Sequence, residues 1–179
     1  MLEITTHSAS QTKKIALALA REVFKSPPAK NAFVIALDGN LGAGKTTFVQ
    51  GFAQGLGIKD ILKSPTFVIM NIYPFEKFQI TNHKSQTKSP PEADPPLAEK
   101  FQKRKNKKTR GHLVHMDCYR IKSPKELVHL GIKEIFKNPE NIVVIEWAER
   151  IKKLIPCGVL WIRFRYGRQK HVRILQISN

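Results

Sequence analysis

The chain has 179 residues, a length typical of one domain, and 41% of them are hydrophobic, which is enough to build a core. Its 31 Lys and Arg outnumber its 14 Asp and Glu, giving a net charge of +17. The longest uncharged run covers only the 13 residues 46–58, short of the roughly 18–20 apolar residues that span a membrane, so we expect a cytoplasmic protein with no membrane contact. Two isolated cysteines, Cys118 and Cys157, predict free thiols in a reducing compartment.

The first half of the chain predicts alternating helices and strands. Ile15, Leu19 and Val23 recur every four residues, which indicates one apolar face of a helix with Ser8 or Ser10 as its N-cap. The elements expected in this half are a helix over about 10–24, a strand over 32–37, a glycine-rich loop over 39–44, a helix ended by Gly57, and a strand over 67–70.

The second half predicts further strands and a terminal hairpin. The elements expected are a strand over 113–116, a helix after the capping box Ser123-Pro124-Lys125-Glu126, a helical turn over 132–136, a strand over 142–145, and an antiparallel hairpin of strands 160–166 and 172–177. Together the two halves predict an α/β fold with a largely parallel sheet flanked by helices and a C-terminal antiparallel hairpin.

The positive charge is concentrated in two segments. Residues 77–110 hold ten Lys and Arg against three acids, and residues 150–179 hold eight against none. Residues 77–110 lack hydrophobic periodicity and contain two Pro-Pro pairs, so we expect a basic, largely disordered insert within a single domain 1–179. Such segments either contact a polyanion or remain solvated, and composition leaves both interpretations open.

A phosphate-binding motif carries the clearest chemical signal. Residues 39–46 read Gly-Asn-Leu-Gly-Ala-Gly-Lys-Thr, which fits G-x-x-x-x-G-K-[ST] between a predicted strand and a predicted helix. Glycines let backbone N–H groups surround phosphate oxygens, Lys45 brings a charge to the β- and γ-phosphates, and the Thr46 hydroxyl can bind Mg²⁺. We therefore predict a P-loop NTPase-like domain. The residues predicted to bind ATP are Leu41, Gly42, Ala43, Gly44, Lys45, Thr46 and Thr47.

Two carboxylates follow apolar strands, where ligands of parallel sheets bind. Asp117 and Glu146 each come directly after such a strand. We expect one to reach Mg²⁺ and the other to hold the attacking water, and the more apolar strand before Glu146 favours it, with Thr46, as the metal ligand. The loop 63–66 occupies the position of a nucleotide switch, with Thr66 as its contact. The predicted catalytic residues are Lys45, Thr66, Asp117 and Glu146. Trp147 lies either beside this site or in the core.

Several motifs in this order resemble one family. They are 39–47, Ser64-Pro65-Thr66-Phe67, His115-Met116-Asp117-Cys118-Tyr119-Arg120, Glu126-Leu127 with Gly131, and Glu146-Trp147. The sequence resembles the TsaE (YjeE) family of small bacterial P-loop ATPases throughout, except over 77–110. Cys118 stands where the family usually has leucine, and the basic insert replaces a short turn.

The resemblance implies a role in making N6-threonylcarbamoyladenosine in tRNA. It implies an ATPase that acts with a TsaB–TsaD-like pair, in which TsaD is the transferase. It also implies that the protein hydrolyses ATP only weakly without this pair. It also implies that Lys45 and Thr46 bind nucleotide and Mg²⁺, and that Asp117 and Glu146 are the family's acidic residues.

Two other functions remain open from the residues alone. A small-molecule kinase would use the same phosphate loop but needs mobile arginines around the transferred group, and only Arg120 can be placed near the sheet edge. A tRNA-binding module with a vestigial ATP site would use the basic insert and the hairpin cations, which are Arg163, Arg165, Arg168, Lys170 and Arg173.

Overall fold

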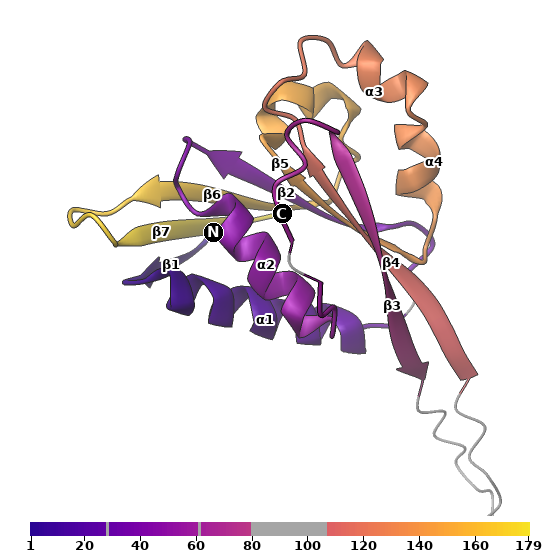
Figure 1. Cartoon of the computed structure of the whole chain (residues 1–179), viewed down its shortest axis with the longest axis horizontal. Coiled ribbons are helices and arrows are strands. Elements are labelled where there is room, and N and C mark those ends of the chain that lie inside the picture. Colours follow the sequence, from indigo (N-terminus) through magenta and orange to yellow (C-terminus); the bar gives the residue numbers. More distant parts are fainter. Residues whose placement is uncertain (28, 61, 80–106) are drawn as a thin grey trace, which may run out of the picture.

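The structure, a computed structural model, describes residues 1–27, 29–60, 62–79 and 107–179. The described residues form one seven-stranded mixed sheet with helices on both faces (Figure 1). The strands are β1 (Leu2–Thr6), β2 (Phe33–Gly39), β3 (Met70–Gln79), β4 (Lys107–Asp117), β5 (Asn141–Glu146), β6 (Leu160–Tyr166) and β7 (Arg173–Ser178). The helices are α1 (Ala9–Lys25), α2 (Lys45–Gly55), α3 (Lys125–His129), α4 (Ile132–Lys137) and the 3₁₀ helix η2 (Ala148–Leu154).

The sheet is less parallel than the sequence predicts. Its order is β1-β7-β6-β2-β5-β4-β3. The pairs β6–β2, β2–β5 and β5–β4 are parallel, whereas β1–β7, β7–β6 and β4–β3 are antiparallel. The prediction of a largely parallel sheet is therefore wrong for β3–β4, whereas the predicted antiparallel hairpin β6–β7 is confirmed. The strands β6 and β7 are antiparallel because only residues 167–172 join them, too few for the crossover helix that parallel neighbours require.

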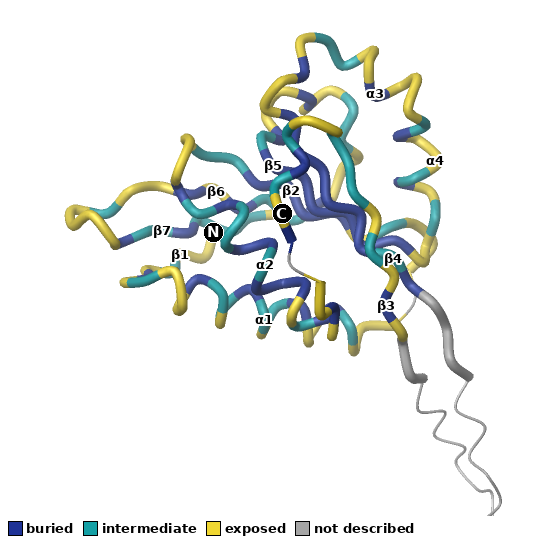
Figure 2. Tube along the Cα trace, in the orientation of Figure 1, coloured by how far each residue is buried: buried dark blue, intermediate teal, exposed yellow. Residues whose placement is uncertain are grey.

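Alternating side chains of the central strands build a core on each face of the sheet. Ile35 and Leu37 of β2 pack with α1 and α2, whereas Val34 and Ala36 pack with α3, α4 and η2. Successive strand residues point to opposite faces, so a strand buried on both sides reads as a continuous apolar run. Figure 2 shows this burial concentrated in the central strands.

The helices α1 and α2 lie against each other on one face of the sheet (Figure 1). Ser8 caps α1 by accepting a hydrogen bond at 3.2 Å from the Gln11 amide, so of the two expected N-caps Ser8 is confirmed. A Cβ on Gly51 would lie 2.4 Å from the Lys13 carbonyl oxygen, and this contact explains why the α1–α2 crossing requires glycine. None of the helices in the described part of the chain is long and apolar enough to cross a membrane.

The predicted strand over 67–70 is wrong except at its last residue. Thr66–Val68 form a turn in which the amides of Val68 and Ile69 both donate to the Pro65 carbonyl, at 3.0 and 2.7 Å. Ile69 has a φ of 67°, a conformation costly for a β-branched residue. The strand begins only at Met70, because this turn interrupts the apolar run.

The borders of the predicted insert also differ. Strand β3 continues through Gln79 and β4 begins at Lys107, with Lys77 opposite Thr109 and Gln79 opposite Lys107. Strand pairing therefore extends into both ends of the range 77–110, and the rest of that range, 80–106, lies outside the described residues. The sequence hides this pairing because the β4 end, 107–110, is entirely polar, and the β3 end, 77–79, holds only one apolar residue, Phe78.

Some elements were not predicted at all. Strand β1 pairs with β7 at the edge of the sheet, and η2 directly follows Trp147.

The capping box before α3 is confirmed in one half: the Glu126 carboxylate accepts from the Ser123 amide at 2.8 Å, whereas the Ser123 hydroxyl accepts from the Lys125 amide at 3.3 Å. Short elements of this kind depend on tertiary contacts more than on a periodic pattern.

Candidate functional site

The phosphate loop joins β2 to α2 at the carboxyl edge of the sheet. Gly44 is the N-cap of α2 with a φ of 103°, in the left-handed region that favours glycine, and no side chain caps the helix. The first amides of a helix have no partner within the helix. The first turn of α2 therefore offers N–H groups and a partial positive charge to an anion.

The Lys45 side chain is buried. It is only 4% exposed, because its Nζ donates to the carbonyls of Gly39 at 2.5 Å and Asn40 at 3.0 Å and lies 3.8 Å from the centre of a Trp147 ring. Burial lowers the pKa of Lys45, against the opposing effect of nearby carboxylates, chiefly Glu146. The lysine side chain thus folds back onto the phosphate loop, beside the place where it is predicted to contact phosphate.

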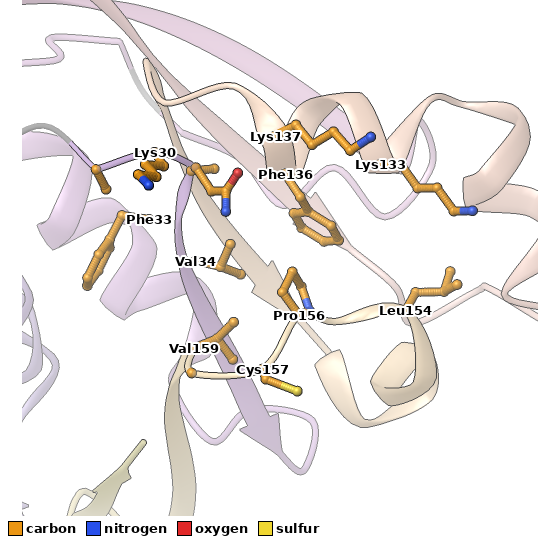
Figure 3. Close-up of a pocket in the computed structure, with 14 residues that line it drawn as sticks. Lys30, Phe33, Val34, Lys133, Phe136, Lys137, Leu154, Pro156, Cys157 and Val159 are labelled. Atoms are coloured by element: carbon orange, nitrogen blue, oxygen red, sulfur yellow. The ribbon is translucent and has the colours of Figure 1, made fainter.

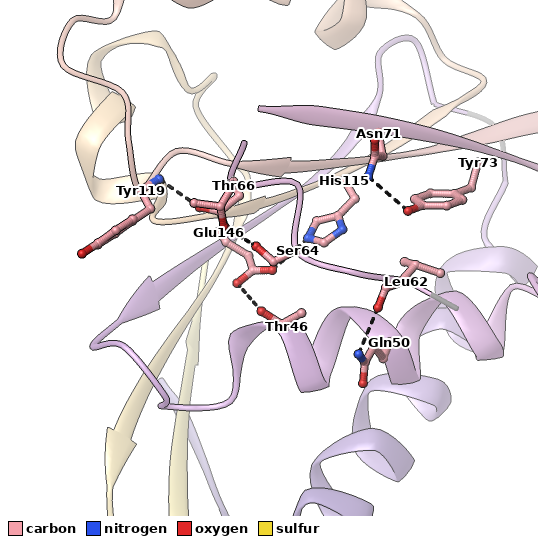
Figure 4. Close-up of polar contacts among 11 residues, drawn as sticks. Thr46, Gln50, Leu62, Ser64, Thr66, Asn71, Tyr73, His115, Tyr119 and Glu146 are labelled. Carbon is pink, nitrogen blue, oxygen red and sulfur yellow. Dashed lines mark hydrogen bonds and ion pairs between the residues drawn. The ribbon is translucent and has the colours of Figure 1, made fainter. Parts of the chain in front are cut away.

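Glu146 connects the phosphate loop to the end of β5. Its Oε2 accepts a 2.8 Å hydrogen bond from the Thr46 hydroxyl, and its Oε1 lies 2.8 Å from Nε2 of His115 on β4 (Figure 4). Both carboxylate oxygens therefore have a side-chain partner although Glu146 is only 2% exposed. His115 belongs to one of the motifs that carry the family resemblance but is not among the predicted site residues, although it lies two residues before Asp117 and so points to the same face of β4.

Asp117 holds the loop that contains Thr66. Its Oδ2 accepts hydrogen bonds from the hydroxyls of Ser64 and Thr66, the latter at 2.6 Å, and its Oδ1 accepts from the Tyr119 amide at 2.9 Å. The start of this loop is tied to α2, where Gln50 donates to the Leu62 carbonyl at 3.0 Å. The loop is therefore docked against the sheet edge.

A pocket of ≈ 370 Å³ brings most of the predicted residues together. Its lining includes Leu41, Gly42, Gly44, Lys45, Thr46, Thr47, Thr66, Asp117 and Glu146. Ala43 is the exception, because it is 1% exposed and belongs to the core between the sheet and α2. Leu41 lies at the rim with 71% of its surface exposed.

A second pocket of ≈ 370 Å³ lies on the other side of the phosphate loop. It shares Gly42, Gly44 and Thr47 with the first, and is otherwise lined by residues from the β1–α1 connection, α1 and the β6–β7 hairpin, which are His7, Ser8, Ala9, Thr12, His171 and Arg173. An Arg173 nitrogen also donates to the Gly42 carbonyl at 3.3 Å. These residues carried no motif, and only the placement of β1 and β7 brings them to the loop.

Trp147 lies beside the site and also contacts the core, so both interpretations of this residue hold. It lines the first pocket and packs on the cluster under η2. Its ring lies 5.0 Å from that of Tyr119 and is approached by the Arg150 guanidinium at 5.8 Å. Trp147 has a φ of 58°, and among the described non-glycine residues it shares a positive φ only with Ile69. Such backbone strain often clusters at functional sites.

The oxygen atoms around Thr46 fit a magnesium ion bound together with phosphates. Mg²⁺ commonly uses one or two protein oxygens and completes its shell with water and phosphate oxygens. The Thr46 hydroxyl and the Glu146 carboxylate, 2.8 Å apart beside the phosphate loop, provide such a pair. No group of three or more His, Cys, Asp or Glu side chains able to hold a metal alone occurs among the residues with described positions.

The chain matches a known family over most of its length. The family model described as "Threonylcarbamoyl adenosine biosynthesis protein TsaE" matches residues 6–88 and 96–174. A solved structure, the crystal structure of Bacillus subtilis YdiB, superimposes with a TM-score of 0.63 at 28% identity, covering 98% of this chain and 83% of the other.

Relatives named "tRNA threonylcarbamoyladenosine biosynthesis protein TsaE" give the same result. The Bacillus subtilis protein is 35% identical over 72% of this chain, and the Rickettsia prowazekii protein is 30% identical over 90% of this chain and 84% of its own length. The chain spans 65% of the matched Haemophilus influenzae protein, at 28% identity, and 58% of the Bacillus protein. The family match runs through the phosphate loop, the Asp117 and Glu146 strand ends and the C-terminal hairpin. By sequence and by fold, this chain is a member of the TsaE family.

Proposed function

We propose that this protein binds ATP with Mg²⁺ and hydrolyses it as a subunit of the machinery that makes N6-threonylcarbamoyladenosine in tRNA. In this proposal it acts with a TsaB–TsaD-like pair and is not itself the transferase. The observation that carries the ATP part is the contact of Thr46 with Glu146 at the start of α2, next to Lys45. The tRNA part rests on family membership and on the names of the relatives.

The two pockets around the phosphate loop suggest how ATP would lie. The pocket with Lys45, Thr46 and the carboxylates would take the β- and γ-phosphates, and the pocket beyond Gly42 and Thr47 would take the nucleoside. Phosphates bound by the amides of the first turn would also provide a new anionic partner for the Lys45 ammonium, which now donates to two carbonyls. The lysine would then turn from its own loop to the ligand.

The carboxylates would have different roles in the reaction. Glu146, beside the Thr46 hydroxyl, would hold Mg²⁺, which neutralises charge on the β- and γ-phosphate oxygens when bound. Asp117 holds the Ser64 and Thr66 hydroxyls at the same edge, so it would position the attacking water and the loop together. Thr66 would reach the γ-phosphate from this docked loop.

The phosphate pocket supports a dependence on partners. Lys45 is its only cationic lining residue in the described part of the chain, and Arg173 lines the second pocket instead. Phosphoryl transfer commonly needs a further cation at the γ-phosphate, and an arginine supplied in trans is worth about 10³–10⁵ in rate. The same pocket gives no support to a small-molecule kinase, which needs arginines around the transferred group.

The test is single-turnover hydrolysis of ATP by the protein alone and with a purified TsaB–TsaD-like pair, with and without tRNA. We expect Mg²⁺-dependent ATP binding by the isolated protein, slow hydrolysis alone, and faster hydrolysis with the pair. Absence of ATP binding would refute the ATPase assignment. Rapid hydrolysis alone that the pair does not change would refute the partner dependence but leave the ATPase assignment in place.

A further inference from the structure

A larger pocket lies at the end of the sheet opposite to the phosphate loop. Its volume is ≈ 590 Å³, and it shares no lining residue with the two pockets around that loop. It opens at Phe33 and Val34, where β2 begins, whereas the phosphate loop follows Gly39, where β2 ends. At ~3.3 Å per strand residue, the two sites lie roughly 20 Å apart along β2. The proposed ATP chemistry therefore does not use this pocket.

The floor of the pocket is apolar. Val34, Phe136 and Val159 are buried beneath it, and Leu154 and Pro156 form its wall (Figure 3). Pockets of ~300–1,000 Å³ with an apolar lining and a few polar groups are the usual sites of small organic ligands. The shape and lining thus suit the hydrophobic body of such a molecule.

The rim of the pocket is cationic. Lys133 and Lys137 lie one helical turn apart on α4, and Figure 3 shows both above the apolar floor, with Lys30 on the other side of Phe136. None of the lining residues is acidic, and all three lysines are exposed. An apolar floor beneath unopposed positive charge is complementary to a molecule that combines an apolar body with an anionic head.

We propose that this pocket binds a free amphiphilic anion, a small molecule with an aliphatic or aromatic body and a carboxylate or phosphate head. The body lies on Val34, Phe136 and Val159, and the head lies within reach of Lys133 and Lys137. This site is separate from the proposed ATP site, so either assignment can fail without the other.

Cys157 provides a reporter that is already part of the pocket. It lines the pocket and is exposed, whereas Cys118 is buried in the core. Burial also raises the pKa of the Cys118 thiol to about 12, which suppresses its reactive thiolate. A neutral alkylating reagent such as iodoacetamide will therefore label Cys157 selectively, and a ligand in the pocket will slow that labelling.

The experiment measures the rate of Cys157 alkylation in the full chain by mass spectrometry, at rising concentrations of decanoate, decyl phosphate or decyltrimethylammonium below micelle formation. We expect one or both anions to protect Cys157, and the arm that protects identifies the head group. In Lys133→Gln/Lys137→Gln, the half-protecting concentration should rise roughly tenfold. The matched control Lys122→Gln/Lys125→Gln, which removes two exposed lysines outside the pocket, should behave as wild type.

Three outcomes would overturn the proposal. They are no protection by either anion, equal protection by the cationic amphiphile, and undiminished protection in the α4 double variant. Protection by a short acidic peptide with apolar side chains, but not by decanoate, would assign the pocket to a segment of another protein. ATP affinity should be the same in both double variants, so a failure here is distinct from a failure of the ATPase assignment.

Discussion

Asp117 and Glu146 lie opposite each other in register at the carboxyl ends of β4 and β5, yet their carboxylates have entirely different partners. Glu146 contacts Thr46 of the phosphate loop and His115, whereas Asp117 holds Ser64 and Thr66. Two neighbouring acids thus divide the site between the phosphate loop and the docked loop.

Glu146→Gln should reduce the effect of Mg²⁺ on ATP affinity, because a neutral amide is a poorer ligand for a hard cation. Loss of one charge-assisted contact of ~1.5–3 kcal/mol corresponds to roughly 10–150-fold in affinity. Calorimetric titration of ATP with and without Mg²⁺ measures the change. The exposed Glu140→Gln, away from both pockets, is the control and should keep the wild-type response.

Asp117→Asn should keep Mg²⁺-dependent ATP binding but lose hydrolysis. The amide cannot accept a proton from water, and a positioned general base contributes about 10²–10⁴ in rate. Single-turnover hydrolysis in the presence of the partner pair measures this loss. If Asp117→Asn lost the response to Mg²⁺ and Glu146→Gln retained it, the two roles would have to be exchanged.

Lys45→Met should weaken ATP binding and yet stabilise the protein without ligand. Loss of a charge-assisted phosphate contact costs ~2–3 kcal/mol, or roughly 30–150-fold in affinity. Burial lowers the pKa of Lys45 in the folded state, so the charged form of Lys45 costs stability at neutral pH. This cost disappears only as the pH rises from the lowered folded-state pKa towards 10.5, the ordinary value.

Thermal melts and ATP titrations of the same samples test both effects of Lys45→Met. Each kcal/mol of stability gained would raise Tm by about 2–4 °C in a domain of this size. The exposed Lys63→Met serves as the control and should leave Tm unchanged. A lower Tm for Lys45→Met would show that the carbonyl and Trp147 contacts outweigh the cost of burial.

His115→Leu should weaken the response to Mg²⁺ although His115 lines neither phosphate-loop pocket. Its ring is fully buried with Nε2 on Glu146, and its Nδ1 has no hydrogen-bond partner. Groups that orient a metal ligand are typically worth ~10–100-fold in metal affinity. His115→Gln, whose amide can replace Nε2–H, should restore the Mg²⁺ titration. Equal behaviour of the leucine and glutamine variants would indicate packing alone.

Replacing residues 80–106 with a short Gly/Ser turn should preserve folding and ATP binding, because strand pairing through Gln79 and Lys107 would remain. Replacing 77–110 should lower Tm, since it removes paired ends of β3 and β4. Thermal melts of the two variants compare these outcomes. A large fall in Tm for the 80–106 variant would show that this segment packs on the domain, and a shallower salt dependence of tRNA binding would support a polyanion role.

Local sequence determined the features that the spacing of residues along the chain reveals. The G-x-x-x-x-G-K-[ST] spacing placed Gly44 at the cap of α2, and the apolar runs before Asp117 and Glu146 placed both acids at strand ends. The predicted bounds of β6 agree with the observed ones, because its apolar and polar residues alternate, as they do in a strand with one buried and one more exposed side. These features depend on neighbours in the chain, so one sequence is sufficient to find them.

Tertiary structure alone decided how the site is assembled. The contact of His115 with Glu146 needs β4 beside β5, and the position of Arg173 next to Gly42 needs β7 at the hairpin edge. The contact of Lys45 with the Trp147 ring and the docking of the Thr66 hydroxyl on the Asp117 carboxylate likewise join residues far apart in the sequence. Strand order and side-chain burial depend on how all segments of the chain pack into one core, and the local spacing of residues does not determine that packing.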